Sequence, residues 1–289
     1  MDGVGRALAH GAVTIVNAIS CGYGAALGID LWTEAKVTLN ENVGVIEGRI
    51  LNDPSESNVL IEKAVSHVLK HFKLEDKYGA YVETRSNIPI AKGLKSSSVA
   101  SNAIALATLS ALNKTLDDLA VINLGVEASF EAGVTVTGAF DDASASYFGN
   151  LVVTDNIKRT ILKIFNPEEY NVLILIPEEK YYTGKSDVER MRLIGREVKA
   201  LHDLALRGEY WTAMTLNGIL YSSILGFDVE PTIKALENGA IAAGLSGKGP
   251  AVAALVPDES IDDVLDAWGE FEGEVIKARI NREKAKILE

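Results

Sequence analysis

A loop between a predicted strand and a predicted helix constrains this chain more than any other stretch. Residues 80–85 alternate in character as a strand does, whereas 99–112 form an alanine-rich apolar run that favours a helix. Between them, residues 87–98 read Asn-Ile-Pro-Ile-Ala-Lys-Gly-Leu-Lys-Ser-Ser-Ser. The first turn of a helix has unpaired N–H groups and the positive end of the helix dipole, which attract anions. Because Gly93 allows close approach of the backbone and the serines can cap the helix, the loop predicts a phosphate site.

Serines before a helix are also ordinary caps, so the loop alone does not establish a phosphate site. Length, composition and charge limit the class of protein to which the chain can belong. The 289 residues, 47% apolar and 24% charged, indicate a globular protein of one large or two ordinary domains. A net charge of −12 argues against a nucleic-acid surface. Cys21 is the only cysteine, which excludes an intrachain disulfide. Residues 11–31 are apolar but interrupted by glycines and polar residues, so we expect no membrane span and a cytoplasmic protein.

The apolar pattern along the chain predicts two regions of different organisation. In the first, we expect strands at 11–19, 25–39 and 43–51, helices at 57–72 and 117–131, and short strands at 151–154 and 160–165. The strand at 43–51 is expected to pair with that at 25–39 as a hairpin, and 133–149 is a stretch of small and polar residues. From residue 171 onward the order is strand, helices, strand, strand, helix, strand, which is the ferredoxin-like order.

Two further motifs accompany the phosphate loop. Residues 244–250 read Gly-Leu-Ser-Gly-Lys-Gly-Pro between two predicted strands, and 137–142 read Thr-Gly-Ala-Phe-Asp-Asp, with Gly149 eight residues after Asp141. Alone, the first is compatible with a simple hairpin turn and the second with solvated helix caps. Together with Pro-x-x-x-Gly-Leu-x-Ser-Ser-Ser at 89–98, they resemble the motifs of the GHMP kinases, the family of galactokinase, homoserine kinase and mevalonate kinase.

This resemblance implies a two-lobed α+β fold, with an N-terminal α/β lobe at 1–158, a ferredoxin-like lobe at 159–289, and ATP and an alcohol between them. It implies that ATP is held by Pro89, Ile90, Ala91, Lys92, Gly93, Leu94, Lys95, Ser96, Ser97, Ser98, Val99, Gly247 and Gly249. Because the family's catalytic carboxylate stands about eight residues before a glycine, the resemblance implies that Asp141 is the carboxylate beside the reacting hydroxyl, with Asp142 as the alternate. Ser97 and Glu131 would hold Mg²⁺, and Glu127, one helical turn earlier, competes with Glu131.

The N-terminal stretch refines the resemblance. Residues 17–30, Asn-Ala-Ile-Ser-Cys-Gly-Tyr-Gly-Ala-Ala-Leu-Gly-Ile-Asp, lack the acidic-histidine signature of the sugar kinases. With 135–143 and 216–221 they are similar to the archaeal shikimate kinases, which use ATP to phosphorylate the 3-hydroxyl of shikimate in aromatic amino-acid biosynthesis. A homoserine or other small-alcohol kinase is the alternative.

An acceptor pocket for shikimate needs several polar groups and a cation for its carboxylate. The resemblance suggests acceptor contacts from Asn17, Ser20, Asp142 and Arg190. The cation stays open among Arg6, Arg85, Lys92, Arg190 and Arg192.

Overall fold

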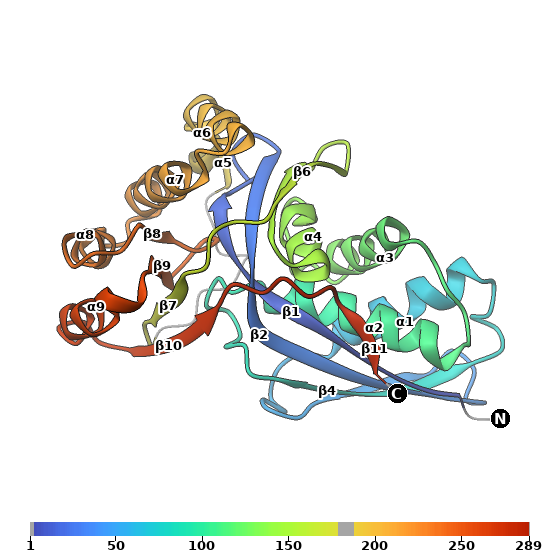
Figure 1. Cartoon of the computed structure of the whole chain (residues 1–289). Helices are drawn as coiled ribbons and strands as arrows, with labels where there is room; N and C mark the ends of the chain where they lie inside the picture. The colour runs from blue at the N-terminus through green and yellow to red at the C-terminus, as the bar shows by residue number, and fades with distance from the viewer. Residues whose placement is uncertain (1–2, 179–187, 289) are drawn as a thin grey trace.

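Two separate sheets organise the chain in the computed structural model, which describes residues 3–178 and 188–288 (Figure 1). The first sheet is built on a long antiparallel pair, β1 (Val4–Val16) and β2 (Tyr23–Asn40), drawn in blue. Its order is β11-β1-β2-β4-β3, and the β5–β6 hairpin pairs with the opposite end of β2. The remaining strands of this sheet are β3 (Ile46–Ile50), β4 (Gly79–Ser86), β5 (Leu151–Asp155), β6 (Thr160–Phe165) and β11 (Lys286–Leu288).

Four helices lie on one side of the first sheet (Figure 1). They are α1 (Val59–His71), α2 (Ser96–Ala111), α3 (Asp118–Glu131) and α4 (Phe140–Phe148). The α2 helix contacts both β1 and β2 as well as the other three helices, so most of its residues are buried. This position explains why α2 is apolar nearly all round instead of having one apolar stripe.

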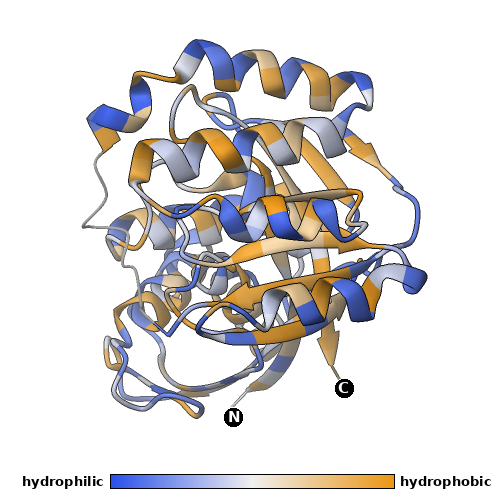
Figure 2. Cartoon of the chain, turned by 90° about the vertical axis from the view of Figure 1, so that its left-hand side faces the viewer, coloured by the Kyte–Doolittle hydropathy of each residue, from blue (hydrophilic) through white to orange (hydrophobic). Residues whose placement is uncertain are grey.

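The second lobe is an antiparallel sheet of order β10-β7-β9-β8, covered on its outer face by helices (Figure 1). Its strands are β7 (Asn171–Ile176), β8 (Ala242–Leu245), β9 (Val252–Val256) and β10 (Glu274–Arg279). Its helices are α5 (Val188–Arg192), α6 (Gly195–Arg207), α7 (Tyr210–Leu225), α8 (Glu230–Glu237) and α9 (Ile261–Trp268). Figure 2 shows largely apolar strands behind helices that alternate between apolar and polar residues. This arrangement confirms the predicted ferredoxin-like order.

Three details of the first lobe differ from the prediction. The β3 strand pairs in parallel with β4 and not with β2, because α1 connects β3 to β4 as a crossover helix. The stretch of small residues at 133–149 contains the α4 helix, which is buried on nearly all sides and therefore lacks the single apolar stripe that marks a helix in a sequence. The predicted boundary at residue 158 cuts the β5–β6 hairpin, and on strand pairing the first lobe runs to Phe165 and also includes β11.

Candidate active site

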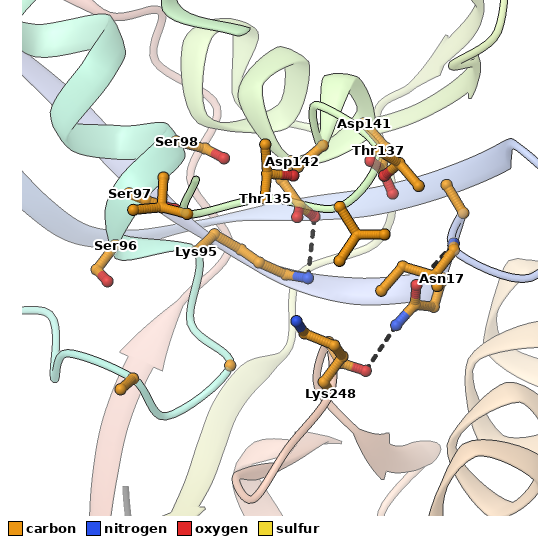
Figure 3. A pocket seen from close by; sticks show the side chains of 18 of the residues that line it. Asn17, Lys95, Ser96, Ser97, Ser98, Thr135, Thr137, Asp141, Asp142 and Lys248 are labelled. Carbon is orange, nitrogen blue, oxygen red and sulfur yellow. Dashed lines mark hydrogen bonds and ion pairs between the residues drawn. The ribbon is translucent and has the colours of Figure 1, made fainter. Parts of the chain in front are cut away.

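Four chain segments surround a cavity of about 130 Å³ between the lobes (Figure 3). They are residues 17–19 after β1, 91–98 before and at the start of α2, 134–142 at the start of α4, and 247–249 between β8 and β9. Both helices begin at this cavity after a residue in the left-handed conformation, Lys95 (φ 65°) and Ala139 (φ 49°). Two helix N-termini therefore direct their unpaired N–H groups into the same region, which favours an anion there.

The predicted phosphate loop lies directly against the glycine-rich turn of the second lobe. The Ser246 hydroxyl donates a hydrogen bond to the carbonyl oxygen of Gly93 at 2.9 Å, and the Ala251 N–H donates to that of Lys92 at 3.2 Å. A Cβ atom on Gly93 would lie 2.2 Å from the Ser246 carbonyl oxygen, and the residue has a φ of +82°. Only glycine satisfies both constraints, so the proximity expected from the two motifs is present.

The two aspartates at the start of α4 both line the cavity but have different partners. Asp141 is 4% exposed, and its Oδ1 accepts a hydrogen bond from the Nδ2 of Asn156 at 2.8 Å. Asp142 is 8% exposed, and its Oδ1 lies 3.0 Å from the Nζ of Lys95 (Figure 3). Burial raises the pKa of Asp142 to about 7, the negative charge of Asp141 adds to this increase, and Lys95 opposes it. Asp142 is thus able to exchange a proton near neutral pH.

Two lysines reach the cavity from opposite lobes. Lys95 precedes α2, and its Nζ lies 3.0 Å from the place where a Cβ atom of Gly247 would be. Lys248 belongs to the glycine-rich turn, and its buried Nζ has no hydrogen-bond partner. Burial and then the charge of Lys95 lower the pKa of Lys248 to about 8, against the attraction of Asp142. By contrast, Lys92 points to the second lobe and donates to the carbonyl oxygens of Pro177 and Glu178.

Asn17 and Ser20, which the resemblance suggests as acceptor contacts, connect the two lobes. The Asn17 Nδ2 donates to the Gly247 carbonyl oxygen at 2.7 Å, and its Oδ1 accepts from the Ile19 N–H at 3.0 Å. The Ser20 hydroxyl donates to the Met191 carbonyl oxygen at 2.7 Å and also contacts the hydroxyl of Tyr221. Asn17 lines the cavity, whereas Ser20 lines a separate open hollow.

The structure does not bring the two predicted metal-binding glutamates to the cavity. The Glu131 carboxylate contacts His67 at 2.8 Å and Lys63 at 3.0 Å, which joins α3 to α1. Glu127 pairs with Arg159 at 2.6 Å. Sequence spacing could not detect this, because it does not show which way a helical side chain points. Of the residues expected to hold Mg²⁺, only Ser97 lines the cavity.

The predicted cations for the acceptor carboxylate also lie outside this cavity. Arg6 pairs with Glu34, and Arg85 lies over the ring of Trp32. Arg190 is exposed on α5, and Arg192 lines the open hollow that also contains Ser20. In the sequence, the motif around Lys248 indicates a role only for its glycines and gives no signal for this lysine.

A second cavity of about 280 Å³ adjoins the phosphate loop on the side of α1. Its lining includes Ile50, Leu60 and Ile61 from the first lobe together with Ile90 and Ala91 of the loop. Ser96 and Ser97 line both cavities, so the start of α2 lies between them. The predicted loop residues Pro89, Leu94 and Val99 line neither cavity, and Leu94 and Val99 are part of the core.

The part of the chain that the structure describes contains no group of three or more acidic, histidine or cysteine side chains placed to hold a metal. The same residues form no helix that is both long and apolar enough to cross a membrane. A metal at this site would therefore depend on few protein ligands and on oxygens of a bound phosphate, which is how Mg²⁺ is usually held in kinases.

Comparison with known proteins agrees with this geometry. Residues 59–150 match the family of GHMP kinases N terminal domains, and residues 190–273 match GHMP kinases C terminal. The homoserine kinase of Cytophaga hutchinsonii has the same fold, with a TM-score of 0.77 at 18% identity over 100% of this chain and 98% of that one. The chain belongs to the GHMP kinase family.

Its similarity within that family is to proteins named shikimate kinase. That of Methanothrix thermoacetophila is 47% identical over 286 residues, which cover 98% of this chain and 96% of the relative. That of Methanosarcina mazei is 47% identical over 283 residues, which cover 97% and 96%. These relatives therefore match the chain across both lobes.

Proposed function

We propose that this protein is a shikimate kinase, which transfers the γ-phosphoryl group of ATP to the 3-hydroxyl of shikimate and releases 3-phosphoshikimate and ADP. The observation that carries the proposal is the 47% identity to proteins named shikimate kinase over 98% of the chain. The cavity independently supports the phosphoryl-transfer part of the proposal, because two helix N-termini, two lysines and two carboxylates converge there. A cytoplasmic location, where ATP is available, is part of the proposal.

We place the nucleotide along the start of α2. Its phosphates would lie at the N–H groups and hydroxyls of Ser96, Ser97 and Ser98, beside Gly247 and Gly249 of the glycine-rich turn. The adenine base would occupy the apolar cavity next to the loop, lined by Leu60, Ile61 and Ile90. The small volume of the central cavity suits a phosphoryl group and the reacting part of the acceptor.

We assign the proton acceptor to Asp142, although the spacing in the sequence favours Asp141. Asp142 lies beside the Lys95 ammonium at the start of the phosphate helix and has a pKa near neutrality, which suits a general base. The Asp141 carboxylate instead accepts a hydrogen bond from Asn156, and we give it the task of orienting the acceptor hydroxyl. Most of the rate would come from positioning and charge neutralisation, as in other phosphoryl transfers.

The donors at the cavity fit a magnesium ion, because Mg²⁺ needs only one or two protein oxygens in addition to phosphate oxygens and water. Ser97 would hold it, and of the two aspartates only Asp141, which is not the proposed proton acceptor, could join it. When bound, the ion neutralises negative charge on the phosphates.

Release of ADP with Mg²⁺, ATP and a set of acceptors tests the proposal. We expect turnover with shikimate and at least a hundredfold lower kcat/KM with homoserine, mevalonate and galactose. Turnover with homoserine or another small alcohol, and none with shikimate, would favour the alternative kinase. Binding of ATP without phosphoryl transfer to any of these acceptors would contradict both assignments.

A further inference from the structure

Lys248 is a charged side chain at the cavity to which the proposed reaction assigns no role. It lies in the turn between β8 and β9, beside Gly247 and Gly249, and lines the cavity with them. Its Nζ is shielded from solvent and makes no hydrogen bond in the described part of the chain. An ammonium group has three protons to donate, and it is costly to leave them unpaired away from solvent. This group is therefore arranged to receive an anionic ligand.

The other charges around Lys248 indicate the sign of that ligand. Lys95 and Asp142 are the charged groups that act on its ammonium, and these two are paired with each other at 3.0 Å. Asp142 is thus already paired with Lys95, and Asp141, the other carboxylate at the cavity, accepts a hydrogen bond from Asn156. The Lys248 ammonium has no such partner among the described residues. Two ammonium groups that lie close together repel one another, so an anion between them would be strongly favoured.

Two anions could enter the cavity beside Lys248, the carboxylate of an acceptor and a phosphoryl group of ATP. The position of Lys248 distinguishes between them. Its turn is bound to the phosphate loop through the hydrogen bond from Ser246 to Gly93. The carboxylate of an acceptor would be unfavourable here, because the acceptor must present a hydroxyl, and not a second carboxylate, to Asp142. An oxygen of the transferring phosphoryl group has to be next to both Asp142 and the phosphate loop.

We propose that the Lys248 ammonium binds oxygen atoms of the transferring γ-phosphoryl group and stabilises their charge in the transition state. Lys248 would supply this positive charge from the second lobe. Glu127 and Glu131 are paired with other side chains, so they are not placed to hold a metal ion that would neutralise the phosphoryl group. The proposal depends on the proposed use of ATP but not on the identity of the acceptor.

Proton uptake on nucleotide binding tests this without any acceptor. At pH 8 about half of the Lys248 side chains are neutral in the free protein, because their pKa is about 8. A bound phosphoryl group should protonate them, so titration calorimetry of a non-hydrolysable ATP analogue with Mg²⁺, in two buffers of different ionisation enthalpy, should measure an uptake of about half a proton. ADP, which lacks the γ-phosphoryl group, should give a much smaller uptake.

Substitutions at Lys248 separate charge from shape. In Lys248→Met we expect no proton uptake, at least tenfold weaker binding of the ATP analogue, ADP binding within about threefold of wild type, and a kcat lowered about a hundredfold or more. Lys248→Arg should restore much of the analogue binding but take up no proton at pH 8, since arginine stays charged. Lys234→Met, at an α8 lysine paired with Glu237, is the matched control and should behave as wild type.

Three results would overturn the proposal. One is wild-type kcat and analogue affinity in Lys248→Met, and another is an equal loss of ADP and analogue binding, which would indicate a purely structural role. The third is absence of proton uptake in the wild-type protein, a result that does not depend on whether Lys248→Met folds. Normal proton uptake without phosphorylation of shikimate would instead contradict the assigned acceptor and leave the role of Lys248 intact.

Discussion

The Nζ atom of Lys95 lies 3.0 Å from Oδ1 of Asp142, and this ion pair joins the residue before α2 to the first turn of α4. The side chains are only 9% and 12% exposed. Removal of one partner from such a pair leaves the other as a poorly solvated charge. The pair therefore stabilises the phosphate loop and the proposed base side by side before any ligand binds.

The two aspartates should respond differently to replacement by the isosteric asparagine. If Asp142 accepts the proton, Asp142→Asn should lower kcat by a factor of about 10² to 10⁴. Asp141→Asn should lower it less, by about tenfold, because the hydroxyl can still be oriented by an amide. Steady-state kinetics with shikimate, together with ADP affinity to verify folding, measures both. The opposite order of effects would return the catalytic role to Asp141.

The pH profile of kcat/KM should be narrow. Asp142 must be deprotonated to accept a proton, and its pKa is raised to about 7, so kcat/KM should rise with pH up to about this value. Lys248 must be protonated to hold a phosphoryl group, and its pKa is lowered to about 8, so kcat/KM should fall above that pH. In Lys248→Arg the decrease at alkaline pH should disappear. An unchanged alkaline decrease in this variant would assign it to another group.

Gly93 and Gly44 form a matched pair for testing the contact between the phosphate loop and the glycine-rich turn. Both have positive φ, +82° and +76°, but a Cβ atom on Gly93 would lie 2.2 Å from the Ser246 carbonyl oxygen, whereas that on Gly44 would meet nothing within 4 Å. Each alanine variant should lose about 1–2 kcal/mol of unfolding free energy through strain. Only Gly93→Ala should also weaken ATP binding, by tenfold or more in calorimetry. Equal ATP affinity in the two variants would mean that the loop tolerates displacement.

Tyr221 should contribute stability across the two lobes. Its hydroxyl donates to the Asn17 carbonyl oxygen at 3.0 Å and accepts from the Ser20 N–H at 3.1 Å. Tyr221→Phe leaves these buried groups unpaired and should lower the unfolding free energy by about 1–3 kcal/mol in urea denaturation. Tyr81→Phe, at a side chain that is 39% exposed, is the control and should change it by less than about 0.5 kcal/mol. A stability loss confined to Tyr81→Phe would be incompatible with this role.

Magnesium dependence distinguishes the predicted metal ligands. Ser97→Ala should raise the Mg²⁺ concentration needed for half-maximal activity several-fold, because its hydroxyl lies at the cavity. Glu131→Gln should leave this concentration unchanged, since the carboxylate is bound to His67 and Lys63. Activity titrations with Mg²⁺ at saturating ATP provide the measurement. If Glu131→Gln needed a higher Mg²⁺ concentration for half-maximal activity, Glu131 would be a metal ligand, as the sequence predicts.

Local chemistry allowed the phosphate loop to be predicted, because a glycine and serines between a strand and a helix favour an anion. The glycine-rich turn and Asp141–Asp142 are ambiguous alone and were predicted from the resemblance to the motifs of the GHMP kinases. The structure brings all three together. The ferredoxin-like order also follows from apolar periodicity and short connections.

Features that depend on the direction of a side chain, or on contacts between segments far apart in the sequence, could not be predicted in this way. The parallel β3–β4 pairing depends on where α1 crosses the sheet, and the orientation of Glu131 depends on the packing of α3 against α1. Asn17 joins Gly247, 230 residues away, through a hydrogen bond that no local pattern encodes.

The pairing of β11 with β1 has a consequence for synthesis of the chain. A ribosome makes β1 first, yet Arg6, Ala7 and Leu8 obtain their partners on that edge only when Lys286–Leu288 have emerged. Residues 247–249, which close the cavity, also emerge late. Shorter chains thus have an open strand edge, which is prone to aggregation, and lack the complete site. The protein would therefore begin to consume ATP only after synthesis has passed residues 247–249.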